Sequence, residues 1–341
     1  MHPTDFAYYL TNFLSKYLPG ERGASPNTIA SYRDTFALFL AYMNKVQHYS
    51  ASALNLKDIS KDTIEDFLKW LETNRNNSIS TRNNRLAAIH AFFQFLQYEN
   101  PDNLHEWQRI LSIPMKRKEK PTITYLSLDG VKLLLSLPEQ ATRQGRRDLA
   151  LLALLYDTAA RVQEVIDLTP AQIRFDNPCT VQLVGKGKKA RIVPMLNSQM
   201  ELLKQYMEEY RLLVPARRCY PLFSNTRGEK LTRAGVNYIL EKYIQKARQE
   251  NACLIPDKFS CHCLRHSKSM HLLQAGVNLV YIRDILGHES IQTTEIYARA
   301  DSKQKREAIE KAYVDLRPES EDEPKWQENP DLLAWLKGLN H

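Results

Sequence analysis

A basic segment with a proline at each end interrupts the chain well before its midpoint. Residues 114–124 read PMKRKEKPTIT, and four Lys or Arg residues lie between or beside the two prolines. Proline disfavours helix in the residue before it, and dense charge disfavours burial. We therefore place a basic linker at 115–124 and expect a folded domain on each side, 1–114 and 125–316, because 341 residues exceed the usual size of one domain.

The first domain reads as a bundle of helices separated by polar turns. In residues 60–71, apolar side chains recur at i, i+3, i+4 and i+7 from Ile64, and the serine at the start is suited to cap the helix. Similar patterns predict a helix that begins at Ser25 and Pro26 and another that begins at Ser80. Each starts with a polar turn and ends apolar, which would leave its first turn accessible.

The pattern of apolar residues in the second domain changes along its length. Residues 145–168 form a long apolar stretch that predicts helix. Alternating apolar residues on either side of Gly185 and Gly187 then predict a β-hairpin with a basic tip. Helical patterns return at 198–211 and 232–250. The chain is therefore predicted to be mostly α with a small antiparallel β-sheet, as a helical domain followed by an α+β domain.

Positive charge is concentrated in the second domain. The chain has 47 Lys and Arg against 39 Asp and Glu, a formal net charge of +8, and residues 125–316 alone have 29 against 21. A polyanion is therefore a candidate partner. Residues 317–341 have three basic and six acidic side chains, so we expect this tail to contact protein rather than phosphate.

The chain shows no pattern of a membrane or secreted protein. No apolar run reaches the roughly 20 residues that a bilayer crossing needs, and the N-terminus lacks a signal-peptide pattern. The five cysteines are irregularly spaced, so we expect reduced, mostly buried thiols in a cytoplasmic protein.

Residues suited to phosphate chemistry occur at several separate positions. His262 and Arg265 are spaced i, i+3, so on a helix they lie on one face and can converge on one phosphate. Arg161 lies in the apolar stretch, where a buried guanidinium needs a partner that Glu164 can provide. Taken singly, the pair of His262 and Arg265 is more typical of helix-surface charge, and the pair of Arg161 and Glu164 is more typical of a structural ion pair.

Two further positions add a cation and a hydroxyl. Lys186 lies at the predicted hairpin tip, and the residues alone do not distinguish it from Lys188 or Lys189. Tyr297 follows His288 by nine residues, after a predicted helix end. A lone tyrosine near an apolar helix is most often a core residue.

Together these positions resemble those of a known family. In order and in surrounding sequence the chain resembles the tyrosine recombinases, also called the phage integrase family, at Arg161, Lys186, His262, Arg265, His288 and Tyr297. The matching segments are TAARVQEVIDL, VGKGKKARIVP, HCLRHS and ILGHESIQTTEIYA. SPNTIASYRDTFALFL and STRNNRLAAIHAFFQFL resemble the family's helical core-binding (SAM-like) domain, so the resemblance covers nearly the whole chain.

The resemblance implies a DNA-cleaving enzyme. Tyr297 would attack a scissile phosphate, form a 3′-phosphotyrosine and release a 5′-hydroxyl. Arg161 and Arg265 would hold the non-bridging oxygens, and Lys186 would protonate the leaving oxygen. Because the phosphotyrosine keeps the bond energy, no metal ion or other cofactor is required.

The resemblance also implies how the enzyme assembles. His262 would assist proton transfer at the nucleophile, and His288 would hydrogen-bond the phosphate. A homotetramer on paired sites of double-stranded DNA would exchange strands through a Holliday junction, with the two domains of each protomer gripping the duplex as a C-shaped clamp. An accessory protein is a further candidate partner.

We expect DNA contacts at the helix starts of the first domain, in the linker and at the hairpin tip. The residues are Asn27, Thr28, Arg33, Thr81, Arg82, Asn83, Arg85, Lys116, Arg117, Lys118, Lys188, Lys189 and Arg191.

The acidic tail at 317–341 ends in PDLLAWLKGLN, which resembles the family's C-terminal docking segment. About ten residues do not make a stable helix alone, so we expect docking on a neighbouring protomer ahead of packing in cis. The contacts would come from Leu332, Leu333, Trp335, Leu336 and Leu339.

The sequence departs from the family pattern before its first arginine and after His266. The family usually has Thr-Gly-x before the arginine, where this chain has Thr158, Ala159 and Ala160. After His266 the family often has Thr-x-Ala, where this chain reads Ser-Lys-Ser. Both changes bear on local packing more than on chemistry.

Cysteines beside the histidines raise a zinc interpretation. Cys253, Cys261 and Cys263 lie near His262 and His266, but the C-x-C pair lacks the second ligand pair that tetrahedral sites use. We expect no metal site there.

Several functions remain open within and beyond the family. We favour integration or excision of a mobile element, with a chromosome-dimer resolvase of Xer type as the alternative. A type IB topoisomerase-like enzyme shares the chemistry but reseals the same strand, and a non-catalytic DNA-binding module is a third class. We expect the protein to associate with the nucleoid in the cytoplasm.

Overall fold

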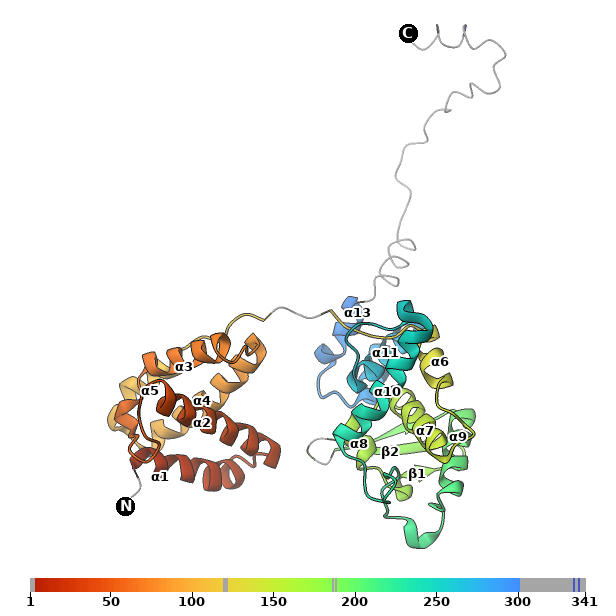
Figure 1. Ribbon diagram of the computed structural model, residues 1–341, viewed down its shortest axis with the longest axis horizontal. Helices are drawn as coiled ribbons and strands as arrows, with labels where there is room; N and C mark the ends of the chain where they lie inside the picture. Colours follow the sequence, from red (N-terminus) through yellow and green to blue (C-terminus); the bar gives the residue numbers. More distant parts are fainter. Residues whose placement is uncertain are drawn as a thin grey trace. The chain divides into compact units, whose positions relative to one another are not determined.

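The computed structural model describes residues 4–118, 122–185, 187, 189–300, 334 and 337. The chain divides into two compact units, Met1–Pro121 and Thr122–His341 (Figure 1). Each unit has its own apolar core. None of the described helices combines the length and the apolar character that a membrane crossing requires.

The first unit is built from helices. In chain order they are α1 (Asp5–Asn12), the π-helix η1 (Phe13–Glu21), α2 (Pro26–Lys45), η2 (Leu56–Asp58), α3 (Lys61–Thr73), α4 (Ile79–Glu99), η3 (Pro101–Asn103) and α5 (Leu104–Leu111). Ser25 and Ser60 cap α2 and α3, so these two predicted helix starts are confirmed. The helix predicted from Ser80 begins slightly earlier, because Ser78 caps α4.

Phe92 of α4 lies at the centre of the first core. Its ring makes edge contacts with Phe6, Phe13 and Phe36 at centroid distances of 5.9, 5.3 and 5.1 Å. Each such pair contributes about 0.5–1.5 kcal/mol beyond the area it buries. Full burial in α2 begins only at Thr35, while Ile29 and Tyr32 in the first two turns pack against the core and remain partly exposed.

The second unit combines helices with a small sheet. Its elements are α6 (Leu128–Ser136), α7 (Arg143–Asp157), α8 (Val162–Ile166), η4 (Pro170–Gln172), β1 (Ile173–Arg174), β2 (Thr180–Val184), β3 (Ala190–Pro194), α9 (Asn197–Glu209), η6 (Pro215–Arg217), α10 (Arg233–Asn251), η7 (Ala252–Leu254), α11 (Cys261–Gln274), α12 (Leu279–Leu286), η8 (Ile291–Thr293) and α13 (Glu295–Ala300).

The described strands form one antiparallel sheet in the order β1-β2-β3. β2 and β3 are the predicted hairpin, with Val181 opposite Val193. Val181, Leu183 and Val193 are buried, whereas Val184 and Ile192 are exposed, as the alternation of a strand requires. The prediction of a mostly helical chain with a small antiparallel sheet is therefore confirmed.

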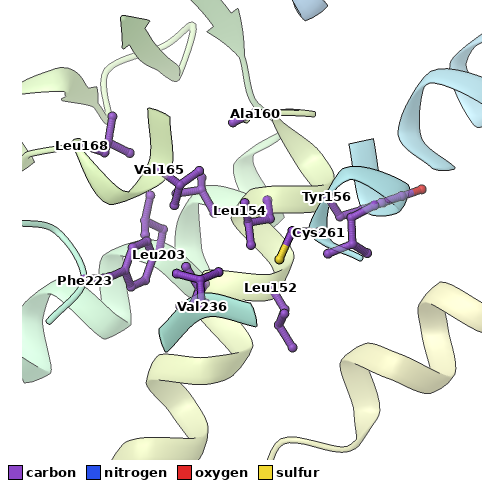
Figure 2. Close-up of a cluster of buried hydrophobic side chains, with 14 of the residues drawn as sticks. Leu152, Leu154, Tyr156, Ala160, Val165, Leu168, Leu203, Phe223, Val236 and Cys261 are labelled. Carbon is purple, nitrogen blue, oxygen red and sulfur yellow. The ribbon is translucent and has the colours of Figure 1, made fainter. Parts of the chain in front are cut away.

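Helix α7 runs through the core of the second unit. Figure 2 shows Leu152 and Leu154 of α7 together with Leu203 of α9, Val236 of α10 and Cys261 of α11. Burying a leucine side chain stabilises a fold by about 1.5–3 kcal/mol. The core thus fixes the C-terminal end of α7 against α11, the helix that carries the predicted histidines and arginine.

The apolar stretch 145–168 is not one helix, contrary to the prediction. α7 ends at Asp157, α8 starts at Val162, and Ala159 between them has a φ of 48°. The Ala159 carbonyl accepts a hydrogen bond of 2.7 Å from Arg265. A contact between positions so far apart in the chain leaves no mark on local periodicity.

Candidate active site

Arg161 stands at the start of α8, directly after the break in the apolar stretch. Its backbone N–H donates to Glu164 Oε2 at 2.8 Å, and its Nη1 donates to Glu164 Oε1 at 2.9 Å. The predicted pairing is confirmed, but the expectation that Arg161 is buried is wrong, because 41% of its side chain is exposed. One carboxylate therefore orients a guanidinium that solvent can reach.

Glu164 is also the partner of Arg191. Arg191 donates from Nη1 and Nη2 to the two carboxylate oxygens at 2.8 and 2.7 Å, and from Nε to the Ile285 carbonyl at 2.8 Å. Burial alone would raise the pKa of Glu164, but the hydrogen bonds from Arg191 and Arg161 hold it below its ordinary value.

The predicted DNA contact of Arg191 stays a prediction, and the structure shows protein partners for this side chain. Its side chain is only 10% exposed, and its guanidinium is occupied by Glu164 and by a carbonyl at the end of α12. Arg191 ties β3 to α8 and α12.

Arg265 is buried on α11, with 1% of the residue exposed. Nη1 donates to the Ala159 carbonyl and Nη2 to the Leu286 carbonyl, both at 2.7 Å. Nε has no hydrogen-bond partner among the described residues. Burial, followed by the charge of Arg161, lowers the pKa of Arg265.

Tyr297 is buried on α13, with 1% exposed. It belongs to a small apolar cluster with Ala159, Met270 and Ile282. Its hydroxyl lies 2.9 Å from His266 Nδ1. Burial raises the pKa of Tyr297, and the Ser269 hydroxyl, followed by the charges of Arg265 and Arg161, offsets this only in part.

His262 and Arg265 have different environments although they share a helix. His262 is exposed at the start of α11, whereas Arg265 is enclosed. Partial desolvation of its ring, then the charges of Arg265 and Arg161, lowers the pKa of His262. The His262 ring meets the ring of His266 at 4.4 Å in a T-shaped contact. His266 thus lies between His262 and Tyr297, a position that sequence reasoning missed because it depends on where α13 docks.

His288 follows the end of α12, where Gly287 adopts a φ of 63°. Its Nδ1 lies 3.0 Å from the Thr294 hydroxyl. Burial, then the charges of Arg265, Arg161 and nearby groups, lowers the pKa of His288 to about 4. The imidazole is therefore neutral at neutral pH.

Arg161 and His288 line an open cleft of about 830 Å³. Lys189 at its edge pairs with Glu289 at 2.6 Å. Lys186 and Lys188, predicted at the same tip, lie outside the described residues. The lining residues are Arg161, Gly185, Gly187, Lys189, Ala190, Arg191, Gly287, His288, Glu289, Ser290 and Thr293.

The predicted contacts in the first turns of α2 and α4 are accessible to different degrees. Asn27 and Arg33 are exposed, and Arg33 pairs with Asp34 at 3.1 Å. Thr28 and Thr81 are partly buried, and their hydroxyls lie 2.9 and 3.1 Å from the capping serines.

Arg82 is not available as predicted. It is 6% exposed, and its Nη1 donates to the Pro114 carbonyl at 3.1 Å, so its guanidinium lies inside the unit. Arg85 donates to a hydroxyl of α2 at 3.1 Å. Asn83 binds both the backbone N–H and the carbonyl of Lys116, at 3.1 and 2.8 Å.

The linker residues predicted to contact DNA are exposed. Lys116 pairs with Glu72 at 2.7 Å, Lys118 donates to the Ser80 hydroxyl at 3.1 Å, and Arg117 is exposed. The predicted protomer contacts lie outside the described residues, at Leu332, Leu333, Trp335, Leu336 and Leu339.

The thiols near α11 have different surroundings. Cys261 and Cys263 are buried, but Cys253 is exposed, contrary to the expectation of buried thiols. Burial raises the pKa of Cys261 to about 12, and its thiol donates to Asn237 at 3.2 Å. Within the described part of the chain, no group of three His, Cys, Asp or Glu side chains is placed to hold a metal ion.

Comparison with known families accounts for both units. Residues 124–304 match the family described as "Phage integrase family". Residues 10–100 match "Phage integrase, N-terminal SAM-like domain". The first match covers more than half of the chain.

Curated relatives extend over most of the sequence. A Sinorhizobium fredii protein, y4rC, is 36% identical over 97% of this chain and 97% of its own length, and its name provisionally describes an integrase/recombinase. "Tyrosine recombinase XerD" of Listeria innocua is 32% identical over 82% of this chain and 90% of its own length.

Solved structures share the fold. The XerH site-specific recombinase bound to palindromic difH substrate, in a post-cleavage complex, has a TM-score of 0.67 and 26% identity, over 88% of this chain and 84% of that chain. The Tn1549 transposon integrase with transposon right end DNA has a TM-score of 0.68 over 89% and 98% of the two chains, and its 16% identity shows the fold alone. The chain belongs to the phage integrase family and is a site-specific tyrosine recombinase, an enzyme that cuts and rejoins DNA strands.

Proposed function

We propose that the cleft beside Arg161 and His288 holds a phosphate of duplex DNA and that Tyr297 attacks it. One observation carries the proposal: three separate segments meet at Ala159. Arg161 follows it two residues later, Arg265 binds its carbonyl, and Tyr297 shares its apolar cluster. Two guanidinium groups and a hydroxyl are thereby grouped at one turn of the backbone.

In the proposed reaction, the Tyr297 oxygen bonds to phosphorus as the bond to the 5′-oxygen breaks. The products are a 3′-phosphotyrosine and a 5′-hydroxyl. The phenol loses a proton, and the leaving oxygen gains one from Lys186, which we assign from the family resemblance. Arg161 and Arg265 neutralise the charge that develops on the non-bridging oxygens.

His262 and His288 complete the proposed set. His262 is exposed on the helix of Arg265 and assists proton transfer. When His288 Nδ1 accepts from the Thr294 hydroxyl, Nε2 carries the proton and can donate it in a hydrogen bond to a phosphate oxygen.

Strand exchange reverses the same chemistry. A 5′-hydroxyl from the partner duplex attacks the phosphotyrosine, the phosphodiester forms again, and the phenol regains its proton. Bond energy is conserved at each step, so the proposed reaction needs neither a nucleotide cofactor nor a metal ion.

The proposed partners are double-stranded DNA with paired recombination sites and further copies of the chain. Docking of the acidic tail would couple the protomers of a homotetramer, and an accessory protein is an additional candidate. The relatives whose names or titles describe recombinases acting on DNA support this assignment, as does the net positive charge of residues 125–316. The proposed place of action is the nucleoid.

For the biological role we propose integration or excision of a mobile element. The 36% identity to a protein described as an integrase/recombinase, over nearly both full lengths, favours this role. The Xer relatives, at 32–33% identity, favour the alternative of a chromosome-dimer resolvase.

Covalent trapping tests the proposal. The protein is incubated with a nicked, fragmented library of host DNA and denatured, and the SDS-resistant adducts are sequenced and mapped by mass spectrometry. We expect an adduct at Tyr297 on discrete inverted sites. Tyr297→Phe should abolish it, while Tyr281→Phe, at a tyrosine 66% exposed on α12, should not.

Other outcomes are decisive as well. An adduct that survives Tyr297→Phe contradicts the assignment of the nucleophile. Tyr297 adducts scattered without sequence preference favour the topoisomerase-like class over a site-specific enzyme.

A further inference from the structure

Helix α11 carries two histidines that each contact a tyrosine hydroxyl. His266 Nδ1 lies 2.9 Å from the hydroxyl of Tyr297, and His271 Nδ1 lies 2.8 Å from the hydroxyl of Tyr156. The two pairs are alike in chemistry and share one helix. Only the first includes the proposed nucleophile, so the second is a natural internal control.

The His266 ring is held from two sides. The ring of His262 meets it at 4.4 Å with an interplanar angle of 73°, and the ring of Tyr297 lies 5.6 Å away. Burial, then the nearby His262 and Arg265, lowers the pKa of His266 to about 4. A neutral imidazole with an unprotonated Nδ1 accepts a hydrogen bond from a phenol.

We propose that His266 is a positioning residue for the nucleophile: its Nδ1 accepts the hydrogen bond of the Tyr297 hydroxyl and fixes the direction in which the phenol oxygen faces the phosphate. This inference rests on the proposed role of Tyr297. It assigns a function to a residue outside the six-residue set, because His266, rather than His262, makes the hydrogen bond to the hydroxyl. Besides its proposed part in proton transfer, His262 contacts the ring of His266 and helps to hold it.

Positioning accounts for the pair better than full proton transfer does. Burial raises the pKa of Tyr297, while His266 is a weak base with a pKa of about 4, so a complete transfer between them is strongly uphill. A hydrogen bond that orients the hydroxyl requires no such transfer. Small errors in the placement of a reacting atom are costly, which makes orientation valuable here.

Three variants separate positioning from a structural role. His266→Ala removes the acceptor, His266→Asn places an amide oxygen close to the former Nδ1, and His271→Ala removes the matched bond to Tyr156. Single-turnover adduct formation is measured with saturating nicked duplex bearing the site found by trapping. DNA affinity and thermal unfolding are measured separately.

We expect His266→Ala to slow adduct formation by about 10- to 100-fold with DNA affinity unchanged. His266→Asn should recover most of the rate, and His271→Ala should cleave at close to the wild-type rate. Where protonation of His266 slows adduct formation by the wild-type protein at low pH, the Ala variant should lack that decrease in rate. The titratable and charged groups facing this ring are His262, Arg265 and Tyr297.

Each contrary result is informative. If His266→Ala cleaves as fast as wild type or faster, the bond only keeps Tyr297 in its buried position and the inference is overturned. Equal losses in His266→Ala and His271→Ala, or no rescue by Asn, also overturn it. If His266→Ala fails to fold, the rates of adduct formation in His266→Asn and His266→Gln are compared instead. Only the shorter Asn amide places its oxygen near the Nδ1 position, so the inference requires a faster rate in the Asn variant.

Failure of this inference can be told apart from failure of the proposed function. An adduct that persists in Tyr297→Phe contradicts the assignment of Tyr297 as the nucleophile, and with it the proposed function. An adduct that is lost in Tyr297→Phe but forms at the full rate in His266→Ala contradicts only the positioning role of His266 and leaves the proposed function in place.

Discussion

The guanidinium of Arg265 is fixed by the backbone of Ala159, a residue in the left-handed region. Nη1 donates to the Ala159 carbonyl at 2.7 Å, and the φ of Ala159 is 48°. A second bond of 2.7 Å runs from Nη2 to the Leu286 carbonyl, and Nε has no partner among the described residues. Two backbone carbonyls therefore set the orientation of Arg265, independently of neighbouring side chains.

The backbone at Ala159 gives a first prediction. Left-handed φ costs a non-glycine residue about 1–2 kcal/mol. Glycine avoids this cost but loses a buried methyl, about 0.8 kcal/mol, and adds about 0.5–1 kcal/mol of unfolded-state entropy. We expect Ala159→Gly to change the free energy of unfolding by less than about 1 kcal/mol, and Ala159→Val to lower it by about 2 kcal/mol or more.

Urea denaturation of the two variants checks this prediction. A valine variant as stable as wild type would mean that the turn relaxes out of the left-handed region when the side chain demands it.

The Glu164 carboxylate gives a second prediction. It is 3% exposed and pairs with Arg191, which is 10% exposed, so its removal leaves a buried guanidinium without its counter-charge. We expect Glu164→Ala to lower the free energy of unfolding by about 3–5 kcal/mol. Asp34→Ala breaks an exposed pair with Arg33 and should cost less than about 1 kcal/mol. Similar losses in the two variants would show that the pairing of Glu164 with Arg191 adds no more stability than an exposed ion pair.

Asp157 gives a third prediction, on pH dependence. Its side chain is 11% exposed and accepts a 2.5 Å hydrogen bond from Gln199. Burial raises the pKa of Asp157 from 3.8 to about 6, although Lys268 opposes this. Between these values the unfolded chain releases the proton while the folded chain keeps it, so this group's contribution to stability falls as pH rises.

Comparison with Asp157→Asn isolates that contribution, because the neighbouring histidines titrate in both proteins. We expect the stability of wild type relative to the Asn variant to fall by about 2 kcal/mol between pH 4 and pH 7. A difference that stays constant across this window, measured by urea titration, would show that Asp157 ionises normally.

Arg33 and Arg82 give a fourth prediction, because one is exposed and the other is buried. Arg33→Ala should leave unfolding unchanged, weaken binding to duplex DNA and reduce the salt slope by about one. Arg82→Ala should destabilise the first unit by about 1–3 kcal/mol through the carbonyl of Pro114 that it leaves unpaired. Binding at several salt concentrations and thermal unfolding decide, and the reverse pattern would restore Arg82 as a phosphate contact.

Features that depend on neighbouring residues could be predicted from the sequence. Ser25 and Ser60 cap helices because their side chains reach backbone N–H groups three residues on, a distance that sequence spacing fixes. The β2–β3 hairpin follows from alternation and from two glycines at its tip. The pairing of Arg161 with Glu164 is likewise local, at i, i+3.

Features that depend on distant segments could not be predicted from the sequence. Whether Arg191 faces solvent or Glu164 depends on how β3 meets α8, and sequence spacing holds no record of that packing. The same is true of His266 and Tyr297, which lie 31 positions apart and meet only when α13 docks on α11. Composition marks Arg82 and Arg33 as equally basic, although tertiary packing encloses only Arg82.

The apolar cluster around Tyr297 is separate from the main core of the second unit. Ala159, Met270, Ile282 and Leu286 pack with the tyrosine, while α7 is anchored among the larger set of buried side chains. Segments with fewer apolar contacts open at a lower free energy than the global fold. Amide hydrogens of α12 and α13 should therefore exchange with solvent through a sub-global opening, ahead of those in α7. Such an opening would let the segment that carries the proposed nucleophile rearrange while the rest of the catalytic fold stays intact.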